Sequence, residues 1–259
     1  MNKTKERLDI FLVSKGFFDS RSKAAQAAKE GRVFVDGKQQ TKPSAEIEPN
    51  AVIECQKDEF VSRAAKKLQK ALKVFGINPN GKTAIDVGAS TGGFTQVLLK
   101  NGAKHVLAVD TGEGQLHPSI ASDPRVENKQ KTNFLKLLPQ TIKAAQLVVC
   151  DVSFVAVEKL KNQFANATCP IIILIKPQFE CGKEYAKKHK GVVKDPAMHQ
   201  KAIQNVVAEF ASVGLNLLGL DVSPILGGDG NREFLALFQK NVAAVPIDIK
   251  KIVEKPTQE

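Results

Sequence analysis

Ile85-Asp86-Val87-Gly88-Ala89-Ser90-Thr91-Gly92-Gly93-Phe94 is a run of apolar residues that passes directly into a glycine-rich turn. This pattern is typical of a β-strand followed by a tight turn and a helix. Two other apolar runs also end in one polar group: Val106-Leu107-Ala108-Val109-Asp110 ends in a carboxylate, and Ile171-Ile172-Ile173-Leu174-Ile175-Lys176 ends in an amine. Ligands of open α/β sheets bind beyond the carboxyl ends of parallel strands. We therefore expect the turn, the carboxylate and the amine to meet at one sheet edge.

From about residue 60 the sequence alternates between predicted strands and predicted helices. Strands are expected at residues 83–87, 105–110, 125–129, 146–151, 170–175, 216–222 and 233–238, and helices at 66–75, 92–100, 156–166 and 196–212. Strands separated by helices pair in parallel through crossover connections. The expected fold class of this region is α/β, with a Rossmann-like sheet.

The first 58 residues differ in character and predict a small α+β domain. Helices are expected at residues 4–16 and from residue 19 or 20 to Gly31, and strands at 33–35 and 51–53. We assign residues 1–58 to this domain, 59–63 to an interdomain linker, 64–242 to the α/β domain and 243–259 to a C-terminal tail.

The charge balance points to a polyanionic partner. The formal net charge is +11, which favours nucleic acid, with an anionic membrane surface second. A lysine-rich solubilising surface is the plain alternative. The longest aliphatic run, residues 171–175, is too short to span a membrane, and the N-terminus is too charged for a signal peptide.

The four cysteines are scattered and form neither a zinc pattern nor a disulfide framework. We expect free thiols in a cytoplasmic protein, with no membrane insertion and no metal site. A monomer is expected.

The glycine-rich turn favours S-adenosylmethionine over a dinucleotide as the cofactor. Serine stands at position 90, where a dinucleotide site prefers its second glycine, and Asp86 would repel a pyrophosphate. Asp110, at the end of the next strand, is placed to accept both hydroxyls of a ribose. The alternative is a helix-packing glycine turn in an inactive fold. The expected cofactor-binding residues are Asp86, Gly88, Ala89, Ser90, Thr91, Gly92, Gly93, Phe94, Asp110, Asn133, Phe134 and Asp151.

Lys176 is the candidate base. A sugar hydroxyl is a poor nucleophile, so methyl transfer to a ribose 2′-oxygen needs a group that removes its proton. The alternative is a lysine that merely extends from a strand end into water. Other polar residues favour the base: Asp151 ends another strand, Lys67 follows the run Ser62-Arg63-Ala64-Ala65, and Glu233 precedes the last strand. Lys66 is the alternative to Lys67 as this second lysine, but the spacing from the run Ser62-Arg63-Ala64-Ala65 favours Lys67.

Residues 5–54 resemble the S-four-type RNA-binding domain of a ribosomal protein and of pseudouridine synthases. The resemblance is carried by Arg7-Leu8-Asp9, Gly16, Ser20-Arg21-Ser22-Lys23-Ala24, Gly31, Val33, Val35-Asp36-Gly37 and Lys42-Pro43. It implies a phosphate-binding face, against the alternative of a solvated basic helix. The candidate RNA-binding residues are Arg7, Arg21, Lys23, Lys29, Arg32, Lys38 and Arg63, with Lys183, Lys187 and Lys188 in a polar insert at residues 180–196.

Residues 5–240 as a whole resemble the TlyA family, which joins this domain to an FtsJ-like ribose 2′-O-methyltransferase. The matching phrases are residues 61–68, 86–95, Asp110, Gly112, Gln115-Leu116, 151–154, 176–180 and Gly230-Asn231-x-Glu233. The resemblance implies that Lys67, Asp151, Lys176 and Glu233 form a catalytic tetrad. It also implies an S-adenosylmethionine-dependent enzyme that methylates cytidine in ribosomal RNA, with ribosomal RNA or ribosomal subunits as partners.

Two other functions stay open at this point. The family was first named as haemolysins, so one alternative is a membrane-active protein. The other is a non-catalytic RNA-binding ribosome assembly factor that keeps the methyltransferase fold. The membrane-active reading lacks an apolar span and a strong amphipathic stripe and leaves the cofactor residues unexplained, and the complete tetrad argues against the assembly factor.

Overall fold

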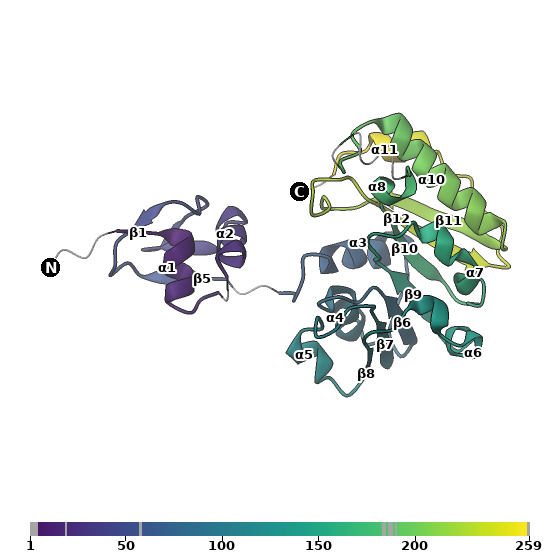
Figure 1. Cartoon of the computed structure of the whole chain (residues 1–259), viewed down its shortest axis with the longest axis horizontal. Coiled ribbons are helices and arrows are strands. Elements are labelled where there is room, and N and C mark those ends of the chain that lie inside the picture. Colours follow the sequence, from purple (N-terminus) through teal and green to yellow (C-terminus); the bar gives the residue numbers. More distant parts are fainter. Residues whose placement is uncertain are drawn as a thin grey trace. The chain divides into compact units, whose positions relative to one another are not determined.

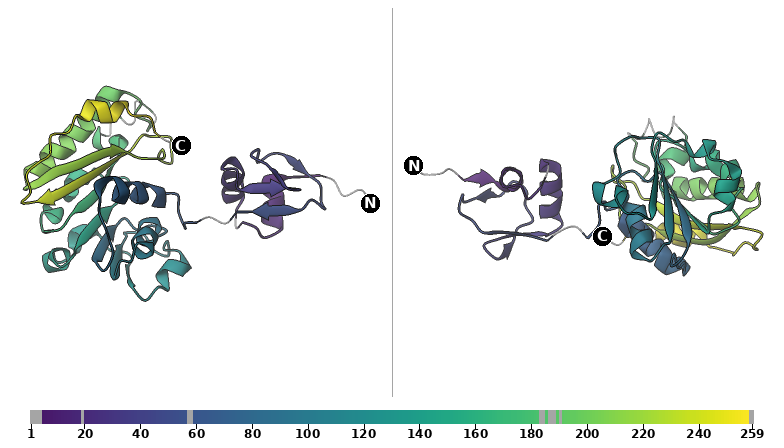
Figure 2. Two further views of the ribbon diagram at one scale, coloured as in Figure 1. Left: turned by 180° about the vertical axis from the view of Figure 1, so that it is seen from behind. Right: turned by 90° about the horizontal axis from the view of Figure 1, so that it is seen from below.

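The structure is a computed structural model of the 259-residue chain, and it describes residues 5–18, 20–56, 59–182, 185, 189 and 191–257. The chain divides into two compact units, Met1–Glu59 and Phe60–Glu259 (Figures 1 and 2). Each unit has a hydrophobic core of its own.

The N-terminal unit combines two helices with short antiparallel strands. Its elements are β1 (Glu6–Arg7), α1 (Leu8–Ser14), α2 (Arg21–Lys29), β2 (Val33–Val35), β3 (Lys38–Gln39), β4 (Glu46–Ile47) and β5 (Ile53–Cys55). The strands form a three-stranded sheet in the order β3-β2-β5 and a separate pair, β1-β4. Leu8 and Leu12 of α1 and Ala24 and Ala28 of α2 are fully buried in one core. The predicted α+β domain is confirmed.

The first helix begins later than residue 4, where the sequence predicts it. Glu6 and Arg7 pair with β4 as a strand, so the helix starts only at Leu8. The second helix begins as predicted, because the Ser20 side chain accepts a hydrogen bond from the backbone N–H of Lys23 at 3.3 Å. A serine in this position satisfies one of the unpaired N–H groups of the first turn.

The second unit contains a seven-stranded sheet in the order β11-β12-β10-β9-β6-β7-β8. The strands are β6 (Thr83–Val87), β7 (His105–Val109), β8 (Val126–Lys129), β9 (Leu147–Cys150), β10 (Ile171–Ile175), β11 (Leu215–Val222) and β12 (Phe234–Lys240). The five strands from β10 to β8 are parallel, whereas β12 runs antiparallel to both β10 and β11. The predicted α/β fold with a mostly parallel sheet is confirmed.

Helices cover both faces of this sheet (Figure 1). They are α3 (Ala65–Phe75), α4 (Gly93–Lys100), α5 (Pro118–Ala121), α6 (Pro139–Lys143), α7 (Lys161–Phe164), α8 (Pro177–Glu180), α10 (Pro196–Ala211) and α11 (Ile249–Glu254), with 3-10 turns at Phe134–Lys136 and Val157–Leu160. The helix predicted at 156–166 is therefore a 3-10 turn followed by the short α7. Ile171, Ile173 and Ile175 of β10 are buried on one face, and Ile172 and Leu174 on the other. A strand buried on both faces explains the unbroken apolar run.

The segments flanking the predicted domain are folded onto the second unit. Within the predicted linker, Val61 donates its backbone N–H to Gln96 Oε1 at 2.7 Å, and the Lys100 amine lies 4.4 Å from the centre of the Phe60 ring. In the predicted tail, Ile252 and Val253 of α11 are buried in the core that also contains α10. No helix among the described residues is both long enough and apolar enough to cross a membrane.

Candidate active site

The sheet topology brings polar residues from distant segments to one edge. Asp110, Asp151 and Lys176 each follow the last residue of a parallel strand. Because β12 is antiparallel to β10, its first residue pairs with the last residue of β10, in the register Ile175 with Phe234. Glu233, which precedes β12, therefore lies at the same edge.

The glycine-rich turn after β6 is tightly packed. Gly88 has a left-handed φ of 85°, and a Cβ at this position would lie 2.8 Å from the carbonyl oxygen of Asp151. Only glycine accepts this combination of conformation and close approach. Gly93 opens α4, and a Cβ there would lie 3.0 Å from the Cβ of Ser62. The turn thus packs between the loop that follows β9 and the residues just before α3.

A cavity of about 560 Å³ lies beside this turn. Of the predicted cofactor-binding residues, it is lined by Gly88, Ser90, Asp110, Asn133, Phe134 and Asp151. A second, smaller cavity of about 150 Å³ is lined by Ala89, Thr91, Gly93 and Phe94 and again by Gly88, Ser90 and Asp151. The two cavities therefore share part of their walls, and the second also includes Lys176.

Asp110 holds the loops around the larger cavity. Its Oδ2 accepts a hydrogen bond from the backbone N–H of Ser90 at 2.8 Å, and its Oδ1 accepts one from that of Gly112 at 2.7 Å. An ionised carboxylate has about four acceptor positions, so this carboxylate keeps capacity for ribose hydroxyls. Phe134 is buried against Phe164, with ring centroids 4.8 Å apart.

Asp86 and Gly92 differ from the other predicted cofactor residues, because neither lines either of these two cavities. Asp86 is fully buried, and its Oδ2 accepts a hydrogen bond from the Thr95 hydroxyl of α4 at 2.7 Å. Its Oδ1 has no hydrogen-bond partner among the described residues. Burial raises the pKa of Asp86 to about 7. In this structure Asp86 joins β6 to α4 beneath the turn.

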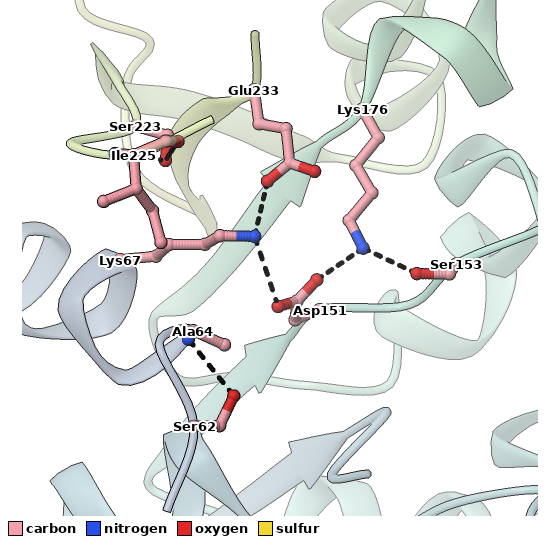
Figure 3. Close-up of polar contacts among 9 residues, drawn as sticks. All are labelled: Ser62, Ala64, Lys67, Asp151, Ser153, Lys176, Ser223, Ile225 and Glu233. Carbon is pink, nitrogen blue, oxygen red and sulfur yellow. Dashed lines mark hydrogen bonds and ion pairs between the residues drawn. The ribbon is translucent and has the colours of Figure 1, made fainter. Parts of the chain in front are cut away.

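The four predicted catalytic side chains form one buried cluster (Figure 3). Lys67 Nζ lies 2.6 Å from Glu233 Oε2 and 3.9 Å from Asp151 Oδ2, and Lys176 Nζ lies 2.6 Å from Asp151 Oδ1. Asp151 thus stands between two amines. Lys67, Lys176 and Glu233 are only 6%, 7% and 3% exposed. Buried charges of this kind persist because they are paired.

Local structure explains how Lys67 and Glu233 reach the cluster. Lys67 lies in the first turn of α3 on its buried side, whereas Lys66 is exposed, so it is Lys67 that joins the cluster. Gly227 leaves room for the carboxylate, since a Cβ there would lie 2.6 Å from Glu233 Oε1. The buried side chain of Asn231 accepts from the N–H of Val193 and donates to the carbonyl of Gly191, which anchors the loop before β12.

Sequence reasoning did not assign Ser153 and Phe154 to the site. Lys176 Nζ donates a hydrogen bond to Ser153 Oγ at 2.8 Å. The sequence does contain a signal for Ser153. Residues two apart in an extended segment point the same way, and Ser153 follows Asp151 by two. Phe154 is 93% exposed beside the larger cavity and has a left-handed φ of 66°. An aromatic residue rarely adopts that conformation, and no sequence pattern predicts it here.

The predicted RNA-binding residues have varied surroundings. Arg7 and Arg21 both donate to Asp9, and the hydrogen bond from Arg7 is the main cause that lowers the pKa of Asp9 to about 2. Arg32 pairs with Glu30 at 2.8 Å. Arg32 is only partly exposed, whereas Arg7, Arg21, Lys23, Lys29, Lys38 and Arg63 are exposed. Lys183, Lys187 and Lys188 lie outside the described residues.

No cluster of three or more metal-ligating side chains occurs in the described parts of the chain. The cluster around Lys67 and Lys176 consists of two amines, two carboxylates and a hydroxyl. Such a set can bind, orient and exchange protons with a hydroxyl group without further components.

Comparisons with known proteins agree with this arrangement. Residues 60–240 match the model of the FtsJ-like methyltransferase family, and residues 6–53 match that of the S4 domain. The 16S/23S rRNA (cytidine-2′-O)-methyltransferase TlyA of Mycobacterium tuberculosis is 38% identical over 235 residues, which cover 88% of this chain and 87% of that protein.

Solved structures are similar over both units or over the second alone. The structure of a proposed hemolysin from Streptococcus thermophilus has a TM-score of 0.74 and 36% identity, and the match covers 96% of this chain and 94% of that one. An S-adenosylmethionine-dependent methyltransferase from Mesorhizobium loti shares the fold, with a TM-score of 0.50 at 16% identity over 69% of this chain and 99% of that one. This chain therefore belongs to the TlyA family, in which an S4 domain precedes an FtsJ-like methyltransferase domain.

Proposed function

We propose that this protein transfers a methyl group from S-adenosylmethionine to the ribose 2′-hydroxyl of a cytidine in ribosomal RNA. The observation that carries the proposal is the buried cluster of Lys67, Asp151, Lys176 and Glu233 beside the cavity that begins at the glycine-rich turn. The nucleotide and the RNA follow from the relative in M. tuberculosis, whose name specifies cytidine in 16S and 23S rRNA.

The larger cavity suits S-adenosylmethionine, which would supply an electrophilic methyl group. Asp110 would accept hydrogen bonds from the ribose hydroxyls of the cofactor, and Asn133 and Phe134 would lie beside its base. Because Gly88 has no Cβ, the backbone of Asp151 packs closely against the turn, and both residues line the two cavities. Asp86 would act indirectly, by holding α4 against β6 beneath the turn.

Lys176 would act as the general base. It lines the smaller cavity next to the turn, and in its neutral form it can take the proton of the 2′-hydroxyl. Asp151, 2.6 Å away, would hold the amine and stabilise the positive charge that it gains. Lys67 would orient the substrate oxygen, and Glu233 would keep Lys67 in place through their 2.6 Å ion pair. Positioning of this kind supplies a large part of the rate in group transfer.

The S4 domain would hold the RNA through its phosphates. The exposed lysines Lys23, Lys29 and Lys38 of this domain are suited to such contacts, and the exposed Arg63 of the second unit would add a further one. Phosphate contacts release counterions, so the affinity for RNA should fall steeply with salt. Arg7 and Arg21 are also exposed and would add phosphate contacts while being held by Asp9.

The test is the transfer of tritiated methyl groups to purified small and large ribosomal subunits and to free rRNA, followed by mapping of the modified nucleotide. We expect a 2′-O-methylcytidine, and we expect Lys176→Ala to lose nearly all of this activity. Methylation of a base, or incorporation by Lys176→Ala at the wild-type rate, would contradict the proposal. Binding of rRNA without any methyl transfer would identify a non-catalytic assembly factor instead.

A further inference from the structure

The second partner of Lys176, the hydroxyl of Ser153, extends the proposed mechanism. Lys176 Nζ lies 2.6 Å from Asp151 Oδ1 and donates to Ser153 Oγ at 2.8 Å (Figure 3). Ser153 lines both the larger and the smaller cavity. The hydroxyl therefore touches the proposed base where the two cavities meet.

The stereochemistry of an amine explains what the contact between Lys176 and Ser153 does. A neutral lysine amine carries two hydrogens and one lone pair, arranged with Cε around the nitrogen as a tetrahedron. Without a hydrogen-bond partner, rotation about the Cε–Nζ bond can turn the lone pair to any of three staggered directions, one of them toward Ser153. The N–H that Lys176 donates to Ser153 excludes that direction, and the 2.6 Å ion pair with Asp151 holds the nitrogen in place. The direction of the lone pair decides whether the base meets the proton that it must remove.

We propose that Ser153 is a positioning residue that aims the lone pair of Lys176 at the 2′-hydroxyl of the substrate. The inference rests on the proposed function, in which Lys176 is the base. In the proton transfer the O–H bond of the ribose breaks, and its bonding electrons stay on the oxygen. The proton is bound by the lone pair of Nζ, which becomes an ammonium group. One of its three N–H bonds remains directed at Ser153, and the carboxylate of Asp151, 2.6 Å from the nitrogen, stabilises the charge.

The backbone around Ser153 restricts where its hydroxyl lies. Phe154, the next residue, is held in a left-handed conformation. Farther along the loop, Val157 donates its N–H to Glu180 Oε1 at 2.8 Å, and Glu180 belongs to α8, which begins directly after Lys176. The segment that carries the hydroxyl and the segment that carries the amine are therefore tied to each other. This tie keeps the hydroxyl near the amine.

The experiment compares Ser153→Ala, Ser153→Thr, Lys176→Ala and the double variant Ser153→Ala/Lys176→Ala with the wild type. Single-turnover methyl transfer is followed at saturating cofactor and rRNA over a pH series, and cofactor affinity is measured by calorimetry. We expect Ser153→Ala to lower the rate about 10- to 100-fold at every pH of the series. Cofactor affinity should be unchanged, and Ser153→Thr, which keeps the hydroxyl, should restore most of the rate.

The double variant tests whether Ser153 acts through Lys176. If it does, removing the hydroxyl from Lys176→Ala should not slow the residual reaction further, because groups that act as a unit are not additive. An equal loss in both backgrounds, a wild-type rate for Ser153→Ala, or a weakened cofactor affinity would each overturn the inference. These outcomes leave the proposed function intact, which fails separately if Lys176→Ala alone transfers methyl groups at the wild-type rate.

Discussion

Removing the carboxylate of Glu233 should destabilise the second unit as well as the active site. In Glu233→Gln the ammonium group of Lys67 loses its 2.6 Å partner while it stays buried. Breaking a buried pair in this way usually costs 3–5 kcal/mol. Asp151 remains 3.9 Å from Lys67 and compensates part of the charge, so we expect a loss of about 3 kcal/mol.

Two further variants serve as controls for this prediction. The double variant Lys67→Met/Glu233→Gln removes both charges, and its stability should return to within about 1 kcal/mol of the wild type, because an apolar replacement of a buried pair is often nearly neutral. Glu113→Gln breaks the pair between Glu113 and Lys131, which is equally short at 2.7 Å but 67% and 65% exposed. It should cost less than about 1 kcal/mol.

Native-state hydrogen exchange read by mass spectrometry suits this measurement. The chain has no tryptophan and one tyrosine, so intrinsic fluorescence reports little. Two compact units also make a single unfolding curve hard to interpret. Exchange of the buried amides of β9 and β10 reports the opening free energy of the sheet itself. The reasoning is refuted if Glu233→Gln behaves like Glu113→Gln, or if the double variant loses as much stability as the two single variants together.

Three other predictions concern the cofactor, a buried acid and the lysine pair. Asp110→Ala should weaken S-adenosylmethionine binding by about 1.5–3 kcal/mol, the scale of hydrogen bonds to a charged group, and an unchanged calorimetric Kd would contradict this. The raised pKa of Asp86 means that the folded state holds its proton more tightly than the unfolded state, so the contribution of Asp86 to stability should be fully present below about pH 4 and be lost as the pH rises through about 7. Asp86→Asn should lose this pH dependence, and native-state hydrogen exchange of the buried amides of β6 in both proteins across that range would reveal or exclude it. Lys67→Ala should abolish methyl transfer to rRNA while Lys66→Ala retains it, and equal activities would remove Lys67 from the proposed mechanism.

Much of the site was predictable because strand ends have a simple signature. Asp110, Asp151 and Lys176 each follow an apolar run, and parallel pairing brings such positions together. Glu233 does not follow from that rule, since it lies at the start of a strand, and its place depends on β12 being antiparallel. The resemblance to a known family supplied it, whereas the sequence pattern alone did not distinguish parallel from antiparallel pairing there.

The position of Asp86 required information about side-chain direction. Asp86 shares a strand face with Ala84, which packs in the core beside α3 and α4, so its carboxylate lies under the turn. Because Asp86 immediately precedes the glycine-rich turn, the sequence reading grouped it with the cofactor residues and did not apply the alternation of side chains between the two faces of the strand. The surroundings of Arg32 also depend on a neighbour in the sequence. Glu30, two positions away, pairs with its guanidinium group and would compete with RNA phosphates for it. Basic residues in a sequence identify charge but not the partners that charge already has.

The ion pair between Lys67 and Glu233 joins residues 166 positions apart in the chain. The larger cavity, by contrast, is lined only by residues between Val87 and Leu160. Closing a long loop costs more conformational entropy and slows folding, so contacts between near neighbours in sequence tend to form first. A newly synthesised chain should therefore gain the ability to bind its cofactor before it gains the ability to use it. Methyl transfer would then report complete folding of the second unit, which cofactor binding does not.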